Sequence, residues 1–370
     1  MHLMDTDSTA FFEHLPRPEP AGGLEYYARE RERALAFDPR RQENYDRYQE
    51  YRRDDPNLNF MPIKLDIENA SRCNFRCTMC AVSSWDKGKR AEDMPFEEFK
   101  ALIDSQYGLV EIKLQGLGEP TMQGEDYFRM IRYARSQKIW VRTTTNASLL
   151  HLKDNYKKLI DSDPNEVQIS VDGADEQTFT SIRRGAVFKQ VIKNCKLIND
   201  YSREVGVRRT KMWVVVQKKN AHQLDKLIDL AADIGFTNMV FSFDMHGFGE
   251  EVLTDQNRRE MVEREFDEKK VQGLIDRGRS RGLDVWFWTV SDKYKTNKPE
   301  NLCPWPFERS FVSSDLRVVP CCMISNPQVI DLGDGTDFSE VWHSPTMEHF
   351  RKDHITGNIP DVCKLCYATR

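Results

Sequence analysis

No stretch of this 370-residue sequence approaches the roughly 18 consecutive apolar residues of a membrane-spanning helix. Positive charge is not in excess either, since 54 Lys and Arg residues stand against 59 Asp and Glu residues. The net charge of -5 provides no basic field for a nucleic acid. The N-terminus lacks the basic start and apolar run of a secretory signal. These absences predict a cytoplasmic protein without a membrane or nucleic-acid partner.

Cysteine is scarce in the middle of the chain, where Cys195 stands alone among apolar residues at helical spacing and is expected to fill the core. The other cysteines form a close triplet and a dispersed C-terminal set. The nine residues are Cys73, Cys77, Cys80, Cys195, Cys303, Cys321, Cys322, Cys363 and Cys366. In a reducing compartment such spacing indicates metal ligation rather than disulfides.

Apolar and β-branched runs alternate with helical patterns along most of the chain. The six predicted strands are residues 63–68, 110–114, 140–144, 167–171, 212–216 and 239–243. Strands separated by helices imply parallel pairing with right-handed crossovers, as in a full or partial β/α barrel. The fold class is therefore α/β, and functional groups are expected at the carboxyl ends of the strands.

At roughly 100 to 200 residues per domain, the length of the chain predicts two or three compact units. The sequence divides into four segments. They are a charged, largely helical arm at 1–59, a partial barrel at 60–250, a helical connection at 251–295 and a small cysteine-rich domain at 296–370. The arm lacks the strand and helix pattern of a domain that recognises leader peptides, which argues against a ribosomal peptide substrate. It is expected to be a surface element, with coverage of the barrel mouth as the alternative.

The triplet Cys73, Cys77 and Cys80 follows the first predicted strand. Three thiolates on a four-iron cluster leave one iron open for a ligand that reacts. A zinc knuckle that lacks its fourth ligand, or chance clustering, is the alternative interpretation.

The arrangement Cys73-x3-Cys77-x2-Cys80 resembles the signature of the radical S-adenosylmethionine (SAM) enzymes. One strand later, Gln115-Gly-Leu-Gly-Glu-Pro120 is similar to the Gly-Gly-Glu-Pro segment of that family, with a leucine between the glycines. The resemblance implies a partial (β/α)6 TIM-like barrel, a 4Fe-4S cluster on the three cysteines, and SAM. Met79 departs from the family, which often has an aromatic residue there, so the adenine pocket is expected to differ.

The resemblance also implies which residues contact SAM. They are Gly116, Gly118, Glu119, Pro120, Thr145, Asn146, Ser170, Asp172, Arg183, Gln217 and Asn220. In the family, the Gly-Glu-Pro segment holds the methionine amino group, and an arginine, here Arg183 with Arg184 as the alternative, meets the carboxylate. The other positions lie near the nucleoside. For Asn220, helix capping is an equally good interpretation.

The C-terminal cysteines supply four thiolates, Cys303, Cys321, Cys363 and Cys366, which suit a closed iron-sulfur cluster or a zinc ion. Residues 303–366 resemble the SPASM or twitch extension of radical SAM enzymes, which implies an auxiliary 4Fe-4S cluster. We expect the shorter, twitch-like form with one auxiliary cluster. Cys322 is the alternative to Cys321 as a ligand of the auxiliary cluster, or it is a thiol near the substrate.

The resemblance implies reductive cleavage of SAM to a 5'-deoxyadenosyl radical that takes hydrogen from an unactivated carbon. We expect oxidation of an alcohol in a polar small molecule, such as a sugar or cyclitol, with the auxiliary cluster as electron acceptor and flavodoxin or ferredoxin as electron donor. The alternatives are an epimerase with Cys322 as hydrogen donor and a peptide-modifying maturase. An iron-sulfur electron carrier or a zinc-stapled binding scaffold would leave Gly116–Pro120 and Arg183 without a purpose.

Overall fold

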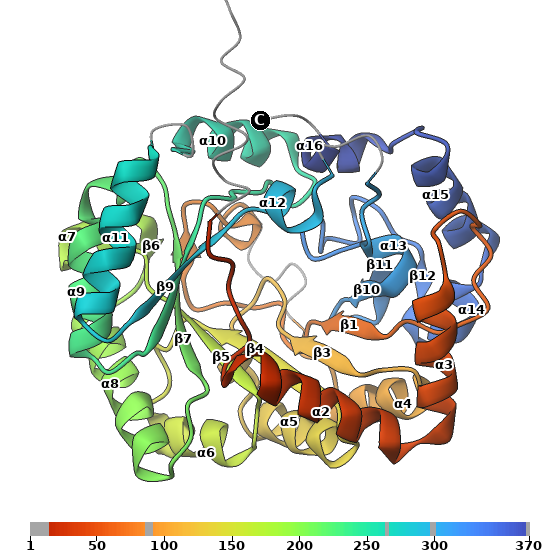
Figure 1. Cartoon of the computed structure of the whole chain (residues 1–370), viewed down its shortest axis with the longest axis horizontal. Coiled ribbons are helices and arrows are strands. Elements are labelled where there is room, and N and C mark those ends of the chain that lie inside the picture. The colour runs from red at the N-terminus through yellow and green to blue at the C-terminus, as the bar shows by residue number, and fades with distance from the viewer. Residues whose placement is uncertain (1–14, 86–91, 263–265, 297–300, 368–370) are drawn as a thin grey trace, which may run out of the picture.

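The computed structural model describes residues 15–85, 92–262, 266–296 and 301–367. One ten-stranded sheet runs through these residues, and eight consecutive strands of it, from β10 to β9, are parallel. Figure 1 shows the sheet as a curved, open wall. In spatial order the strands are β12 (Gly333–Asp334), β11 (Arg317–Val319), β10 (Arg309–Val312), β1 (Lys64–Ile67), β3 (Glu111–Leu114), β4 (Trp140–Thr145), β5 (Glu166–Ser170), β7 (Thr210–Val215), β8 (Asn238–Ser242) and β9 (Asp284–Trp288).

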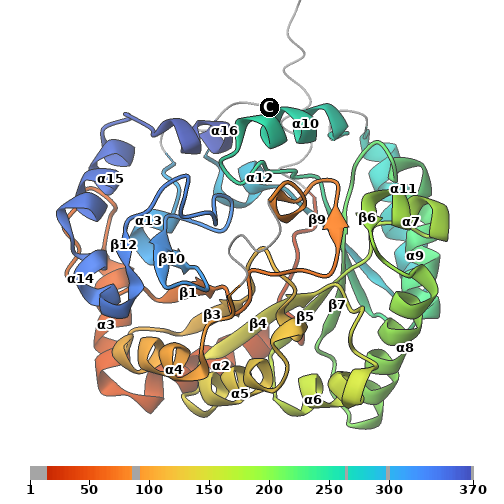
Figure 2. The same ribbon diagram turned by 180° about the vertical axis from the view of Figure 1, so that it is seen from behind.

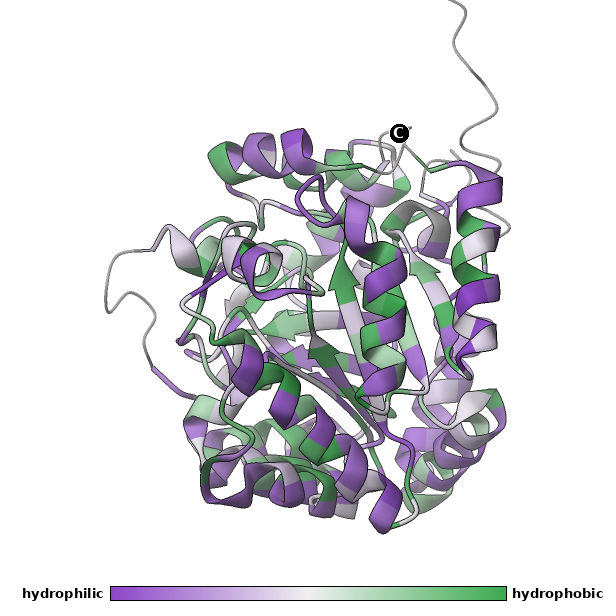
Figure 3. Cartoon of the chain, turned by 90° about the vertical axis from the view of Figure 1, so that its left-hand side faces the viewer, coloured by the Kyte–Doolittle hydropathy of each residue, from purple (hydrophilic) through white to green (hydrophobic). Residues whose placement is uncertain are grey.

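Helices cover the outer face of this wall. They include α4 (Phe96–Ser105), α5 (Glu125–Ser136), α6 (Asn155–Asp161), α7 (Glu176–Ile182), α8 (Phe188–Glu204), α9 (Leu224–Asp233) and α11 (Glu268–Ser280). Each presents one apolar stripe to the strands; α9, for example, buries Leu224, Leu227, Ile228 and Ala231 at helical spacing. Figure 3 shows hydrophilic residues on the outer faces of these helices and hydrophobic residues on the strands. The predicted α/β barrel class is confirmed, and all six predicted strands are present within two residues of their expected ends.

The wall is longer than the six predicted strands. The segment 251–295, predicted as a helical connection, contains α10 (Glu251–Glu260), α11 and the strand β9, which pairs with β8. At the other side, β10 from the C-terminal segment pairs with β1 in parallel register. Both outer strands of the six-strand unit are therefore covered, which removes two edges that could otherwise pair with another chain.

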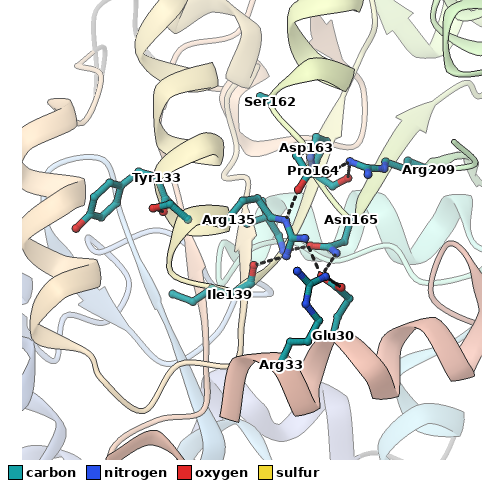
Figure 4. Close-up of polar contacts among 12 residues, drawn as sticks. Glu30, Arg33, Tyr133, Arg135, Ile139, Ser162, Asp163, Pro164, Asn165 and Arg209 are labelled. Atoms are coloured by element: carbon teal, nitrogen blue, oxygen red, sulfur yellow. Dashed lines mark hydrogen bonds and ion pairs between the residues drawn. The ribbon is translucent and has the colours of Figure 1, made fainter. Parts of the chain in front are cut away.

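The N-terminal arm forms α2 (Gly23–Phe37) and α3 (Pro39–Glu50). Glu30 of α2 is buried and forms an ion pair with Arg135 at the end of α5, with 2.7 Å between Oε2 and Nη2. Figure 4 shows this pair beside Asn165, whose amide nitrogen donates to the same Glu30 oxygen. Asp163 binds Arg135 from the other side at 3.2 Å. These contacts make the arm part of the packed structure rather than a loose surface helix.

The arm lies at the amino ends of the strands. The Tyr27 hydroxyl donates to Glu111 Oε2 at 2.8 Å, and the Ala21 N–H donates to Glu166 Oε2 at 2.8 Å. Glu111 and Glu166 are the first residues of β3 and β5. The cysteine triplet follows the carboxyl end of β1. The described part of the arm therefore does not cover the mouth of the barrel at which the cysteines lie.

Candidate active site

A small second sheet holds the loop that carries the cysteine triplet. Its strands are β2 (Arg76–Cys77) and β6 (Arg183–Arg184), which pair antiparallel so that Cys77 lies opposite Arg183. The Thr78 N–H donates to the carbonyl of Ile182 and extends the pairing by one residue. Figure 2 shows the two strands side by side. The cysteine triplet and the Arg183–Arg184 pair, which are far apart in the sequence, thus form one structural unit.

Of the three cysteines, Cys77 is buried and Cys73 and Cys80 are half-buried. Burial raises the pKa of Cys73 and of Cys80 to about 12, and the pKa of each thiol is also raised by the neighbouring Cys77. The Arg183 guanidinium is nearby, because its Nη1 lies 3.8 Å from Cys77 Sγ. Soft sulfur donors gathered beside this cation suit a metal centre that would hold them as thiolates. The three residues therefore fit a 4Fe-4S cluster with one open iron position.

The Gly-Leu-Gly-Glu-Pro turn after β3 packs directly on the segment that leads to the triplet. The Leu117 N–H donates to Glu68 Oε1 at 2.9 Å, and the Glu119 N–H donates to the Arg72 carbonyl at 2.9 Å. A Cβ atom on Gly116 would lie 2.1 Å from Glu68 Cγ, and one on Gly118 would lie 2.1 Å from the Ala70 carbonyl oxygen. Both glycines are thus required by contacts within the chain.

Replacing Gly118 by Ala is expected to lower both the melting temperature and the iron content after anaerobic reconstitution. The new Cβ would also lie 2.5 Å from the Arg72 carbonyl oxygen, so the backbone before Cys73 must move. The matched control is Gly273→Ala in α11, where nothing lies within 4 Å of the added Cβ. This control should keep its iron and gain up to about 1 kcal/mol of stability. Equal iron contents in the two variants would contradict the prediction.

The Glu119 carboxylate, predicted to hold the methionine amino group, has several partners within the chain. Its Oε1 accepts hydrogen bonds from the Thr121 and Thr145 hydroxyls at 2.6 Å each, and its Oε2 accepts from the Asn146 N–H at 2.7 Å. Burial raises the pKa of this carboxyl. Glu119 therefore joins the carboxyl ends of β3 and β4. Its contact with SAM stays a prediction.

Asn146 links the end of β4 to the cysteine loop. Its Nδ2 donates to Asn74 Oδ1 at 3.0 Å and lies 4.0 Å from Cys73 Sγ. Its Oδ1 accepts from the Ser148 N–H at 2.9 Å. Of the predicted SAM-contacting residues, Asn146 therefore lies beside the first cysteine.

Asp172, just after β5, pairs with Arg183. The Oδ2 to Nη2 distance is 2.7 Å, and both side chains are buried. Asp172 Oδ1 accepts from the Val215 N–H at 2.8 Å, which ties the end of β5 to β7. The guanidinium predicted to meet the methionine carboxylate is thus oriented by Asp172 beside Cys77. Ser170, at the end of β5, is partly exposed.

Gln217 and Asn220 have different roles although both were predicted near the ribose. Asn220 Nδ2 donates to the carbonyls of Asp172 and Val215 at 3.0 and 2.9 Å, and its Oδ1 accepts from the Gln217 N–H. Its side chain makes no helix cap. Gln217 is fully buried, and among the described residues its side-chain oxygen and nitrogen have no hydrogen-bond partner. A buried amide without partners is costly unless a ligand supplies them.

Replacing Gln217 by Leu is expected to weaken SAM binding by about tenfold without lowering stability. Leucine has a similar volume, and its introduction removes a buried polar group that has no protein partner. The matched control is Asn220→Leu, which should lower the free energy of unfolding because it breaks three hydrogen bonds to backbone groups. Equilibrium dialysis with SAM and chemical denaturation measure the two effects. If Gln217→Leu bound SAM with unchanged affinity, Gln217 would not contact SAM.

The C-terminal cysteines gather on one side of β10 and β11. Burial raises the pKa of Cys321 well above its ordinary value, and Cys322, Cys363, Cys366 and Cys303 raise it further in that order. The pKa of Cys363 is raised likewise by burial, then by Cys303 and Cys366. The predicted auxiliary ligands are therefore neighbours in space. A cubane cluster spreads four cysteines over four irons, so its ligands need not converge on one point.

Cys322 faces a different environment from Cys321. Burial raises the pKa of Cys322, and the charged side chains that act on this pKa are Asp66, Lys113, Arg309 and Lys293. The pKa of Cys321 is raised by burial and by the other four C-terminal cysteines. The two adjacent thiols thus have different electrostatic surroundings, which favours Cys321 as the auxiliary ligand.

Sequence reasoning missed the residues of α10 that hold the cysteine loop. Gln256 Nε2 donates to the Thr78 carbonyl at 2.8 Å, and Asn257 Nδ2 donates to the Met79 carbonyl at 3.1 Å. Glu250 accepts from the Trp85 indole at 3.2 Å and from the Asn326 amide at 3.3 Å. Helix α10 begins at Glu251, within the segment predicted as a helical connection. No pattern near these residues indicates that they reach a loop more than 160 positions earlier.

Residues 69–231 match the radical SAM superfamily, and residues 303–367 match the iron-sulfur cluster-binding SPASM domain. The chain contains a radical SAM domain and a SPASM domain. These two domains imply SAM, a 4Fe-4S cluster and auxiliary iron-sulfur binding as the cofactors. How many auxiliary clusters it binds, and through which cysteines, remain predictions. Among the described residues, no helix has the length and apolar character needed to cross a membrane.

Similar sequences come from several radical SAM groups. Mycofactocin maturase MftC of Mycolicibacterium smegmatis is 30% identical over 198 residues, which are 52% of this chain and 48% of MftC. A probable GTP 3',8-cyclase of Sulfurisphaera tokodaii is 28% identical over 200 residues, which are 53% of this chain and 61% of the cyclase. The chain thus spans about half the length of MftC.

Solved structures show the same fold at low identity. Streptococcus suis SuiB bound to the precursor peptide SuiA superposes with a TM-score of 0.61 at 16% identity, covering 79% of this chain and 67% of SuiB. The anSMEcpe structure with bound AdoMet has a TM-score of 0.57 at 19% identity, covering 83% of this chain and 85% of that protein. Both likenesses support the barrel and its C-terminal extension as one architecture.

Proposed function

We propose that this radical SAM enzyme modifies a peptide. The observation that carries the proposal is the presence of both iron-sulfur domains on one continuous sheet, in which β10 of the C-terminal segment pairs with β1 of the barrel. Proteins with this fold have been solved with peptides bound, namely SuiB with SuiA and anSMEcpe with the Cp18Cys peptide. The similarity to a maturase, MftC, supports the same class of substrate.

The expected oxidation of a sugar or cyclitol receives no such support, because the sequence relatives described above are a maturase and a cyclase. The argument against a peptide rested on the arm, which lacks the pattern of a leader-binding domain. A short peptide that enters the barrel directly does not need such a domain. Peptide modification is therefore preferred over alcohol oxidation.

With its cluster and SAM bound, the site supplies a 5'-deoxyadenosyl radical that removes hydrogen from a substrate carbon. Residues of the chain hold the cysteine loop and Arg183 in place for this chemistry. The β2–β6 pair and the α10 side chains hold the cysteine loop, and Asp172 orients Arg183 beside Cys77. The Gln217 amide offers a donor and an acceptor for SAM. The surrounding strands and helices exclude water that would quench a radical.

The test uses the anaerobically reconstituted holoenzyme with SAM and a reductant. Candidate peptides carrying deuterium at aliphatic carbons and, separately, a panel of sugars and cyclitols are offered. The proposal expects deuterium in 5'-deoxyadenosine and a mass change in a peptide, both absent in Cys73→Ala. Formation of a ketone from a polyol, with no peptide altered, would overturn the proposal. Oxidation would then be the activity.

A further inference from the structure

Tyr367 connects the first and the last of the predicted auxiliary cysteines. It directly follows Cys366 in the short helix α16 (Lys364–Tyr367). Its hydroxyl oxygen accepts a hydrogen bond from the Cys303 N–H at 2.8 Å, across a separation of 64 positions in the sequence. This hydrogen bond therefore fixes the segment that carries Cys303 against the segment that carries Cys366.

The Tyr367 hydroxyl has a second partner on another helix. His354 of α15 (Pro345–Ile355) places its Nδ1 2.9 Å from the same oxygen, and the centres of the two rings lie 5.7 Å apart. His354 is only 1% exposed, and the Phe350 ring packs against it in a T-shaped contact with 5.0 Å between ring centres. The core of the C-terminal segment thus holds this imidazole in place.

The direction of these hydrogen bonds follows from the groups involved. A backbone N–H can only donate, so the phenol oxygen accepts from Cys303 and keeps one proton to donate. Burial lowers the pKa of His354 to about 4, so near neutral pH the imidazole is uncharged and one ring nitrogen can accept. The hydrogen bonds therefore run from the Cys303 amide through the Tyr367 hydroxyl to His354 Nδ1.

The other side of the same cysteine segment is also held by the chain. The Thr296 hydroxyl donates to the Cys366 carbonyl, and Thr296 is buried. The Cys363 N–H donates to the Pro360 carbonyl at 2.8 Å, within the turn that leads into α16. The backbone groups named here beside Cys303, Cys363 and Cys366 thus have partners within the protein.

We propose that Tyr367 and His354 are positioning residues for the auxiliary cluster, which engage the Cys303 amide and withhold it from the sulfur atoms of the cluster. Hydrogen bonds to these sulfur atoms help to set the reduction potential, because a donor stabilises the more negative, reduced state. The pair therefore keeps the potential lower than a free amide would. The inference goes beyond the proposed function, since it rests on the predicted ligands Cys303 and Cys366 and on no particular substrate.

The test compares Tyr367→Phe with the parent protein, both as anaerobically reconstituted holoenzymes. A redox titration followed by electron paramagnetic resonance gives the potential of the auxiliary cluster. Its signal is the one that persists when Cys73, Cys77 and Cys80 are replaced by Ala. Tyr367→Phe keeps the ring and removes the acceptor of the Cys303 N–H. The reduction equilibrium constant is expected to rise about tenfold, which is about 59 mV for one electron.

Two variants of His354 separate positioning from packing. Asn presents an amide oxygen near the position of Nδ1, so His354→Asn should keep the potential of the parent. His354→Leu removes the acceptor of the phenol proton and should give part of the rise seen in Tyr367→Phe. The matched control is Tyr201→Phe in α8, which loses a hydrogen bond to Asp161 of 2.7 Å and should leave the potential unchanged.

Deuterium electron-nuclear double resonance in D2O provides a second measurement. The reduced Tyr367→Phe protein should show an exchangeable deuteron coupled to the cluster that the parent lacks. A lower melting temperature with an unchanged potential would overturn the proposal, because the contacts would then serve stability alone. Zinc in the C-terminal site would overturn it as well. If Tyr367→Phe binds no auxiliary cluster, the His354 variants decide, and equal potentials in Asn and Leu would contradict the inference. None of these measurements needs a peptide, so they are independent of the proposed function.

Discussion

Replacing Cys73, Cys77 and Cys80 together by Ala is expected to abolish 5'-deoxyadenosine formation and to lower iron from about eight to about four atoms per chain. The reason is local, because the three thiols lie on the loop that the β2–β6 pair holds. Iron, acid-labile sulfide and nucleoside are measured after anaerobic reconstitution.

The matched control for the triple variant is Cys195→Ala. Cys195 is fully buried in α8 and lies in the apolar core. It should lose stability through a small cavity and retain all its iron and nucleoside formation. Nucleoside produced by the triple variant would show that the triplet does not hold the reactive cluster.

The second large effect is expected at two adjacent residues. Cys321→Ala should remove the auxiliary cluster and about four irons, whereas Cys322→Ala should keep the full iron content. The reason is that the pKa of Cys321 is raised by burial and by the other C-terminal cysteines, whereas that of Cys322 is influenced by burial and by Asp66 and Lys113. Metal analysis for iron and zinc, with electron paramagnetic resonance of the reduced proteins, measures the difference.

The reverse pattern, with iron lost from Cys322→Ala only, would assign the ligand to Cys322. Zinc in place of iron at the C-terminal site would support the zinc alternative and remove the auxiliary electron acceptor. If Cys322→Ala keeps its iron and still alters the peptide without inverting a stereocentre, the epimerase alternative is excluded, since that reaction needs the thiol as hydrogen donor.

Much of the barrel could be predicted because each of its strands and helices is indicated by residues that are close together in the sequence. Each strand is a short apolar run flanked by helical patterns, and the turns after β1, β3, β4 and β5 carry polar residues at the predicted positions. Strand β9 was missed because Asp284–Trp288 follows two charged helices and its burial depends on pairing with β8. The pairing of β10 with β1 joins residues about 245 positions apart, a separation that no local pattern reports.

Cysteine spacing and the residue types around it predicted iron-sulfur cofactors and SAM, because coordination chemistry depends on donor type and short-range spacing, and the domain matches support these cofactors. The functions of single polar residues depend instead on what lies beside them after folding. Asn220 and Gln217 are three residues apart, yet Asn220 forms hydrogen bonds to backbone groups, whereas the Gln217 amide has no hydrogen-bond partner among the described residues. Likewise Asp66 and Glu111 belong to ordinary strands, and within the described ranges Glu111 has ion-pair partners whereas Asp66 has none. Burial and pairing are properties of contacts between distant segments, so they emerge when the sheet closes around them.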